Sequence, residues 1–142
     1  MLERKKGHIV AVSSAAGIIG APYMADYTAS KHGVLGLMSS LREELHALDK
    51  KHCIRLTTIC PVTFDSGFVK RPYSRFPTIL PVLTIKEVAQ GALDGILREK
   101  SVVTLPCWVG YFFSWFRIFP DSVFLAFQRF LKHHPLPPIK TN

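Results

Sequence analysis

The part of this sequence that says most about its fold is GHIVAVSSAAG, residues 7–17. Within it, Ile9 to Ser14 is a short apolar run with β-branched residues, and Ser13 to Gly17 is a run of small residues. A continuous apolar run of this length is typical of a strand buried on both faces, as the strands of parallel sheets are. We therefore predict a buried strand that leads into a loop.

The segment that follows predicts a long helix and a second strand. From Tyr27 to about Leu48, apolar residues recur at the spacing of one helix face. Ile54 to Cys60 is a second β-branched run, which Pro61 ends. A strand, helix, strand order of this length predicts a parallel crossover. We attribute Gly33 and Gly36, inside the helix, to the close approach of a second helix or a sheet.

A second helix and a third strand complete the predicted sheet. Thr84 to Glu87 has the S/T-x-x-E form of a capping box, and one apolar helix face follows as far as Arg98. Ser101 to Leu105 is a third short strand. Residues 61–83 contain four prolines, which indicates an irregular excursion of the kind that covers a site. The order predicts an α/β fold with a parallel sheet of about three strands.

The composition and charge place the chain among globular proteins. Its 142 residues suffice for one domain and exclude a two-domain enzyme. Hydrophobic residues make up 48% and charged residues 20%, which excludes wholesale disorder. The net charge of +8 permits contact with nucleic acid or with an anionic membrane. The three cysteines form no CxxC pair and the histidines show no metal-ligand spacing, so we expect reduced thiols and no metal site.

The C-terminal part of the chain is unusually aromatic. Ten of the 25 residues from Cys107 to Leu131 are aromatic. The apolar part from Val102 to Phe116 is broken by Pro106 and is shorter than the roughly 20 residues of a membrane-spanning helix. We expect residues 107–134 to face a membrane or an apolar pocket. The alternative, a hydrophobic subdomain folded back onto the core, is equally open, and residues 135–142 are expected to be a flexible tail.

Three side chains are candidates for chemistry. Tyr27 and Lys31 are four residues apart, so a helix places them on one face. A nearby cation favours the phenolate form of a tyrosine, which allows proton exchange at neutral pH. Ser14 lies at the carboxyl end of the first strand, where open parallel sheets bind ligands, so its hydroxyl and the phenol can contact one substrate oxygen. The alternative is an ordinary helical Tyr and Lys beside a turn.

These motifs together resemble the short-chain dehydrogenase/reductase family. The match consists of GHIV at 7–10, SSAAG at 13–17 and YTASK at 27–31, with Tyr27 thirteen residues after Ser14. The resemblance covers most of residues 7–106 and corresponds to the C-terminal half of such an enzyme, with a Rossmann-like, doubly wound parallel sheet. The aromatic C-terminal segment is more similar to the membrane-associated retinol and 17-beta-hydroxysteroid dehydrogenase branch.

The resemblance implies a role for each of the three side chains. Tyr27 is then the acid/base that exchanges a proton with the alcohol or carbonyl oxygen. Lys31 favours the phenolate and bonds the nicotinamide ribose, and Ser14 orients and polarises the substrate oxygen. The cofactor is NAD or NADP, which carries out the hydride transfer. The implied function is oxidation or reduction at the CH-OH or carbonyl group of a lipophilic, retinoid- or steroid-like substrate.

The loop after the second strand departs in part from the family pattern. The family places Pro-Gly there, followed by a Thr near the carboxamide. Pro61 matches, Val62 replaces the Gly, and Ser66 takes the place of the Thr. The implied cofactor-binding residues are therefore Tyr27, Lys31, Pro61, Val62 and Ser66.

Other features of the family have no counterpart in this sequence. Its Gly-rich phosphate turn and ribose-selecting residue precede the position where this chain begins, and its catalytic Asn is not matched. We interpret residues 1–106 as a partial catalytic domain without the nucleotide-binding half, in a truncated gene model, isoform or pseudogene product. Alone, it is expected to bind NAD(P) weakly, to turn over little, and to expose an unpaired strand edge that favours association with a partner.

The alternative function is a non-catalytic remnant that binds a membrane or pairs with a complete relative. Pairing would use the helices at 27–48 and 84–98 and give a homo- or heterodimer. The basic and aromatic residues between Phe68 and Phe76 suggest either nucleic-acid stacking or a substrate lid or membrane-facing rim. We favour the lid or rim, so no nucleic-acid partner is expected. The cation run at Lys132 fits lipid headgroups and a location on the endoplasmic reticulum membrane or a lipid droplet, at its cytoplasmic face.

Overall fold

The structure is a computed structural model that describes residues 1–50, 53–67, 81–116 and 118–131. Three predictions fall outside these residues: the basic and aromatic stretch between Phe68 and Phe76, the cation run at residues 132–134, and the tail at 135–142.

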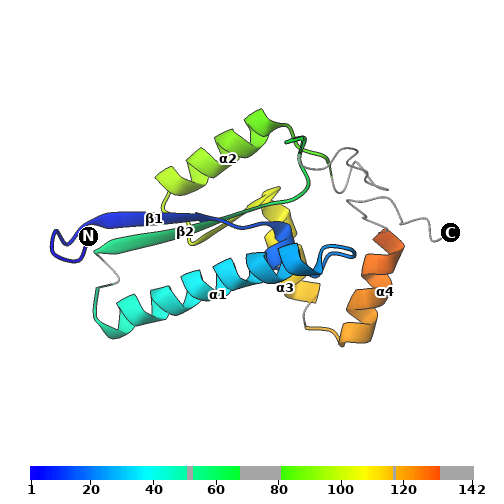
Figure 1. Cartoon of the computed structure of the whole chain (residues 1–142), viewed down its shortest axis with the longest axis horizontal. Coiled ribbons are helices and arrows are strands. Elements are labelled where there is room, and N and C mark those ends of the chain that lie inside the picture. The colour runs from blue at the N-terminus through cyan, green and yellow to red at the C-terminus, as the bar shows by residue number, and fades with distance from the viewer. Residues whose placement is uncertain (51–52, 68–80, 117, 132–142) are drawn as a thin grey trace.

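Three parallel strands form the sheet, as the sequence predicted. They are β1 (Gly7–Val12), β2 (Ile54–Pro61) and β3 (Val102–Leu105), in the order β1-β2-β3. The register places Val12 opposite Ile59, and Pro61 opposite Leu105. All three strands therefore end on the same side of the molecule (Figure 1). In a parallel sheet this carboxyl edge is where ligands bind.

The two predicted helices of the crossovers lie on opposite faces of the sheet. They are α1 (Ala25–Ala47) and α2 (Ile85–Leu97) (Figure 1). The inner side of α1 buries Met38 and Leu45 against Ile54 and Leu56 of β2. The predicted capping box starts α2: the Thr84 hydroxyl accepts from the Glu87 backbone N–H, and the Glu87 carboxylate accepts from the Thr84 N–H.

The interpretation of the glycines inside α1 was wrong. A Cβ added to Gly33 or Gly36 meets nothing within 4 Å in the described part of the chain. The close helix–sheet approach is instead at α2, where a Cβ on Gly91 would lie 2.5 Å from Leu105 Cδ2. A Cβ on Gly95 would collide with Val103. The absent side chains therefore let α2, not α1, pack closely on the sheet.

The strands differ in burial because of their place in the sheet. All but one residue of β2 is buried, since it has a neighbour on each side. β1 and β3 are the edge strands among the described residues, and Val10 and Val12 of β1 are exposed, Val12 by 64%. The open edge agrees with the expectation of an unpaired first strand. The prediction that this strand is buried on both faces was wrong, because none of its residues is buried and a neighbour pairs with it on one side only among the described residues.

The aromatic segment forms two further helices, and a short 3-10 turn follows β1. They are α3 (Cys107–Phe116) and α4 (Asp121–Leu131), and the 3-10 turn η1 is Ala15–Gly17. Val109 and Phe113 of α3 are buried with Ala15 and Val62, while α4 packs its aromatic rings on α3. The outer side leaves Tyr111 82% exposed. Within the described ranges, no helix combines the length and apolarity that crossing a membrane requires.

Candidate functional site

A large pocket opens at the carboxyl edge of the sheet. It has a volume of about 1330 Å³ and an overwhelmingly apolar lining. Two parts of the chain form its sides. The polar wall comes from the end of β1, η1 and the start of α1, and consists of Ser13, Ser14, Tyr27 and Lys31. The apolar wall comes from three later helices and consists of Val88, Ala92, Ile96, Phe113 and Leu125.

Ser14 is placed by the turn that follows β1. It is the N-cap of η1, and its Oγ accepts from the Ala16 N–H at 3.2 Å. Its hydroxyl also donates to the Pro61 carbonyl, but at 3.4 Å, which is long for an O–H···O hydrogen bond. The Ser14 hydroxyl is therefore fixed in position while its proton is only weakly held, so it can donate to a substrate oxygen.

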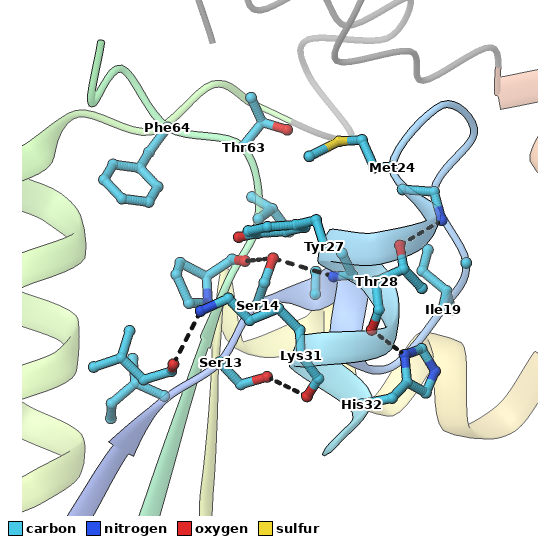
Figure 2. A pocket seen from close by; sticks show the side chains of 18 of the residues that line it. Ser13, Ser14, Ile19, Met24, Tyr27, Thr28, Lys31, His32, Thr63 and Phe64 are labelled. Atoms are coloured by element: carbon cyan, nitrogen blue, oxygen red, sulfur yellow. Dashed lines mark hydrogen bonds between the residues drawn. The ribbon is translucent and has the colours of Figure 1, made fainter. Parts of the chain in front are cut away.

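Tyr27 and Lys31 lie one turn apart near the start of α1, as the sequence predicted. The Lys31 Nζ is 5.4 Å from the centroid of the Tyr27 ring. It also donates to the Val12 carbonyl at 3.3 Å. Figure 2 shows the hydroxyl end of Tyr27 and the Ser14 hydroxyl directed to the same part of the pocket, with Lys31 reaching past them to the strand end. The structure thus brings the three predicted side chains together.

Ser13 and Gly17 hold the polar wall together, a role that the sequence analysis did not assign. Ser13 is buried, and its hydroxyl donates to the Lys31 carbonyl at 2.9 Å. A Cβ on Gly17 would lie 2.6 Å from that same carbonyl oxygen and 2.6 Å from Ser13 Oγ. Because Gly17 has no side chain, η1 can pack directly on the turn of α1 that carries Lys31. The run of small residues was the available signal, although only the tertiary contact explains it.

Cys60 is a buried thiol beneath the polar wall. Burial raises the pKa of Cys60 to about 11, although the Ser13 hydroxyl, the Ser14 backbone and the nearby Lys31 ammonium each favour the thiolate. The thiol is therefore neutral at physiological pH. It serves as a packed side chain of β2 and does not act as a nucleophile.

The end of β2 and the loop after it bring Pro61, Val62 and Ser66 to the pocket. The Val62 side chain is buried in the cluster with Val109 and Phe113, and its N–H donates to the Leu105 carbonyl at 2.9 Å. The chain at Val62 thus stays hydrogen-bonded to the end of β3, and its side chain has a place in the core. This explains how a valine is accommodated where the resemblance implies a glycine. Ser66 is exposed at the pocket rim.

Several lining residues were not identified from the sequence. Thr63 and Phe64 follow β2, and Met24 precedes α1. Figure 2 shows these three side chains around Tyr27. His32 also lines the pocket and forms a 3.0 Å hydrogen bond from Nδ1 to the Thr28 carbonyl. Arg129 of α4 completes the lining. In the ranges that the structure describes, no group of His, Cys, Asp or Glu could hold a metal ion.

The polar wall fits the nicotinamide end of NAD(P). Lys31 gives one N–H to Val12, and an ammonium has further donors for ribose hydroxyls. The exposed end of β1 leaves space beside it. The described residues contain no Gly-rich turn between a strand and a helix that would cradle the cofactor's phosphates.

Comparison with known proteins agrees with this arrangement. Residues 1–75 match the family model described as short chain dehydrogenase. Human 17-beta-hydroxysteroid dehydrogenase 13 is 37% identical over 129 residues, 91% of this chain and 42% of that protein. Human estradiol 17-beta-dehydrogenase 11 is 31% identical, with the same coverage of both chains. Bovine short-chain dehydrogenase/reductase family 16C member 6 is 39% identical over 75% of this chain and 33% of its own length. The chain thus spans less than half of these relatives.

Solved structures of low identity share the fold. A short-chain dehydrogenase from Sphingobium yanoikuyae in complex with NADPH superposes with a TM-score of 0.63 at 21% identity, covering 99% of this chain and 50% of that one. A short-chain dehydrogenase from Burkholderia cenocepacia in complex with NADP gives a TM-score of 0.65 at 20% identity, covering 96% and 50%. With the family match over more than half of its residues and a polar wall built from the family's motifs, the chain belongs to the short-chain dehydrogenase family.

Proposed function

We propose that the pocket is the substrate side of an NAD(P)-dependent oxidoreductase site for lipophilic alcohols or ketones. The observation that carries the proposal is the meeting of Ser14, Tyr27 and Lys31 in one otherwise apolar pocket. The names of two relatives, a 17-beta-hydroxysteroid dehydrogenase and an estradiol 17-beta-dehydrogenase, support a steroid-like substrate. The same apolar lining suits a retinoid.

In this mechanism the polar wall handles the substrate oxygen and its proton. The nicotinamide, when bound, supplies or accepts the hydride. The Tyr27 hydroxyl gives its proton to the carbonyl oxygen in reduction and takes it back in oxidation. The Ser14 hydroxyl donates a hydrogen bond to the same oxygen. The Lys31 ammonium beside the ring stabilises the phenolate that remains after proton transfer, and the apolar wall keeps water away from the reacting carbon.

The remaining cofactor contacts belong to residues other than those described. We propose that they lie on a unit that adds a strand to the open edge of β1, next to the exposed Val10 and Val12. The described residues contain no Gly-rich turn between a strand and a helix, so without such a unit the pyrophosphate lacks this cradle. The chain alone is therefore expected to bind NAD(P) weakly and to turn over little.

A chimera tests the proposal. This chain replaces the matching 129-residue segment of human 17-beta-hydroxysteroid dehydrogenase 13, and NAD(P)-linked turnover of estradiol and retinol is compared for the chimera and the chain alone. We expect turnover by the chimera and a loss of about 10²-fold for its Ser14→Ala variant, because a donor to the developing oxyanion is removed. Full activity in the Ser14→Ala variant would refute the assigned site. A folded chimera that binds NADH without turnover would favour the alternative, a non-catalytic partner of a complete relative.

A second proposal concerns a lipid surface as partner. The observation that favours it is the set of exposed apolar side chains on and beside α3, including Tyr111, Trp115 and Ile118. Tryptophan and tyrosine suit the interface between headgroups and acyl chains. We propose that this surface contacts the cytoplasmic face of the endoplasmic reticulum membrane or of a lipid droplet.

Vesicle flotation tests the lipid proposal. With phosphatidylcholine vesicles that contain phosphatidylserine, Trp115→Ser is expected to reduce the bound fraction several-fold. Leu37→Ser is the matched control, because Leu37 is also exposed, by 66% against 55% for Trp115, but lies on α1. Equal losses in the two variants would contradict a specific surface on α3.

A further inference from the structure

The pocket contains a cation that the proton-transfer chemistry does not use. Arg129 lies in the last turn of α4, is exposed, and lines the pocket together with Leu125 from the preceding turn. The ion pairs found among the described residues join Arg55 to Glu99 and Arg98 to Asp94, and Arg129 takes part in neither. Arg129 therefore lines the pocket without an ion pair to a carboxylate of the described part of the chain.

The charges around the pocket all have one sign. The described residues that line it include the cations Lys31 and Arg129 but neither an aspartate nor a glutamate. Lys31 is held between the Val12 carbonyl and the Tyr27 ring, and His32 uses Nδ1 for the Thr28 carbonyl. This leaves Arg129 as the cation of the described lining whose charge is not engaged within the protein.

Aromatic packing fixes the position of Arg129. Two residues before it, Phe127 stacks on Phe116 of α3 with ring centroids 4.4 Å apart. One turn earlier, Phe124 meets the buried Phe113 edge-on at 6.4 Å. A basic residue in a last helical turn also favours the helix dipole, but that effect does not require it to line a cavity. The helix thus holds a guanidinium at the pocket through its contacts with the core.

We propose that the ligand of this pocket is a lipophilic alcohol or ketone that also carries an anionic group, a carboxylate or phosphate, which Arg129 binds. The inference rests on the proposed function and names its substrate class. A guanidinium offers paired N–H donors that match carboxylate and phosphate oxygens. The apolar body of the ligand lies against the apolar wall, and its hydroxyl or carbonyl reaches Ser14 and Tyr27. Neutral steroids and retinol would leave Arg129 without a partner.

A pair of fluorescent polyenes that differ only in the end group tests the inference. Binding of cis-parinaric acid and of the corresponding alcohol, parinaryl alcohol, is titrated with the full chain by fluorescence. We expect about tenfold tighter binding of the acid, because one charge-assisted contact distinguishes the two probes. Arg129→Gln should bring the two affinities within about twofold by weakening only the acid, and Arg129→Lys should keep part of the preference. Arg98→Gln, which removes a cation paired with Asp94, is the control that should leave it unchanged.

Each other outcome overturns the inference. Equal affinities for acid and alcohol, or failure of both probes to bind, would show that the pocket does not recognise an amphiphilic anion. If Arg129→Gln leaves the preference intact but weakens NADPH binding, the cation serves the cofactor. If it weakens only binding to phosphatidylserine vesicles, the cation serves a lipid headgroup. Thermal unfolding followed by circular dichroism verifies that the variants fold. If Arg129→Gln does not fold, the comparison of Arg129→Lys with the wild type still tests the inference.

The readout is independent of hydride transfer. Tyr27→Phe should lower kcat of the chimera by at least about 10²-fold and leave the preference for the acid unchanged. Failure of the proposed function and failure of this inference are therefore separable.

Discussion

The two walls of the pocket are built in opposite ways. The polar wall comes from residues 13–31, which form one stretch of the sequence. Its geometry depends on the hydrogen bonds of Ser13 and Lys31 and on the missing side chain of Gly17. The apolar wall comes from residues 88–125, on three helices that meet only in the folded chain. Reaction chemistry is thus encoded locally, whereas the shape and charge offered to the ligand depend on packing between distant elements. The following experiments act on one wall at a time.

The largest effect is expected from removing the phenol of the polar wall. Tyr27→Phe in the chimera should lower kcat by 10²- to 10⁴-fold, because it deletes the group that exchanges the proton. Steady-state kinetics measure kcat, and a fluorescence titration measures the affinity for parinaric acid. Only kcat should change. Tyr23→Phe is the control, since Tyr23 is exposed and outside the pocket lining. A Tyr27→Phe chimera that retains wild-type kcat would contradict the assignment.

On the apolar wall, the largest loss of stability is expected from Phe113→Ala. Phe113 is 3% exposed and packs with Val109 and Phe124, so truncation should leave a cavity and cost about 3–5 kcal/mol of unfolding free energy. Urea denaturation measures the loss. Tyr111→Ala on the outer side of the same helix should change stability by less than about 0.5 kcal/mol. Similar losses for the two variants would mean that α3 does not pack on the core in solution.

Adding one methyl group to the polar wall tests its tight packing. Gly17→Ala should cost about 1–3 kcal/mol, because the new Cβ meets the Lys31 carbonyl and the Ser13 hydroxyl. Displacement of Lys31 should also lower turnover by the chimera. The control is Gly20→Ala, where an added Cβ meets nothing within 4 Å in the described residues. If Gly17→Ala and Gly20→Ala unfold at the same urea concentration, the close approach of Gly17 to the Lys31 carbonyl does not contribute to stability.

The thiol beneath the polar wall predicts a stability change at alkaline pH. The pKa of Cys60 is raised by burial from 9.0 to about 11, so the folded chain keeps the proton after the unfolded chain has lost it. The contribution is fully present below pH 9 and is lost as pH rises toward 11, by up to about 1.4 kcal/mol per pH unit. Urea denaturation from pH 8 to 10 should show this slope in the wild type and in the Cys107→Ala control, and a shallower slope in Cys60→Ala. Parallel slopes for all three proteins would refute the prediction.

The smallest effect is expected at the start of α2, which carries much of the apolar wall. Thr84→Ala should cost about 1 kcal/mol by removing the N-cap hydroxyl. The pKa of Glu87 is lowered by the Thr84 N–H and hydroxyl, so the capping contribution is present above the ordinary glutamate pKa and is lost as pH falls below it. Urea denaturation at pH 7 and pH 3 compares Thr84→Ala with Lys86→Ala. A cost that is unchanged in acid would exclude a contribution from the hydrogen bond between the Thr84 hydroxyl and the Glu87 carboxylate.

Most element boundaries were predictable from local patterns. Strand ends coincide with prolines, as at Pro61, and the helix face of α1 and the capping box at Thr84 repeat at fixed spacing. The glycines of α1 show where such reasoning fails. Gly33 and Gly36 look like packing glycines in sequence, but Gly91 and Gly95 make the close approach, because α2 carries them opposite Leu105 and Val103. Whether a glycine faces a neighbour depends on the rotation of its helix, which spacing does not fix.

The sequence was sufficient to place Tyr27 and Lys31 together, because they are one helical turn apart and that separation is set by local backbone geometry. Ser14 was identified from its place at the end of the first strand, although its approach to α1 depends on the tertiary contact at Gly17. Only the tertiary structure shows that Arg129, nearly a hundred residues after Lys31, lines the same pocket. It was also needed to show that Val12 is exposed while the similar residues of β2 are buried. Burial and long-range proximity depend on which elements pack together. That pairing is set by the sum of many weak apolar contacts, which no single motif encodes.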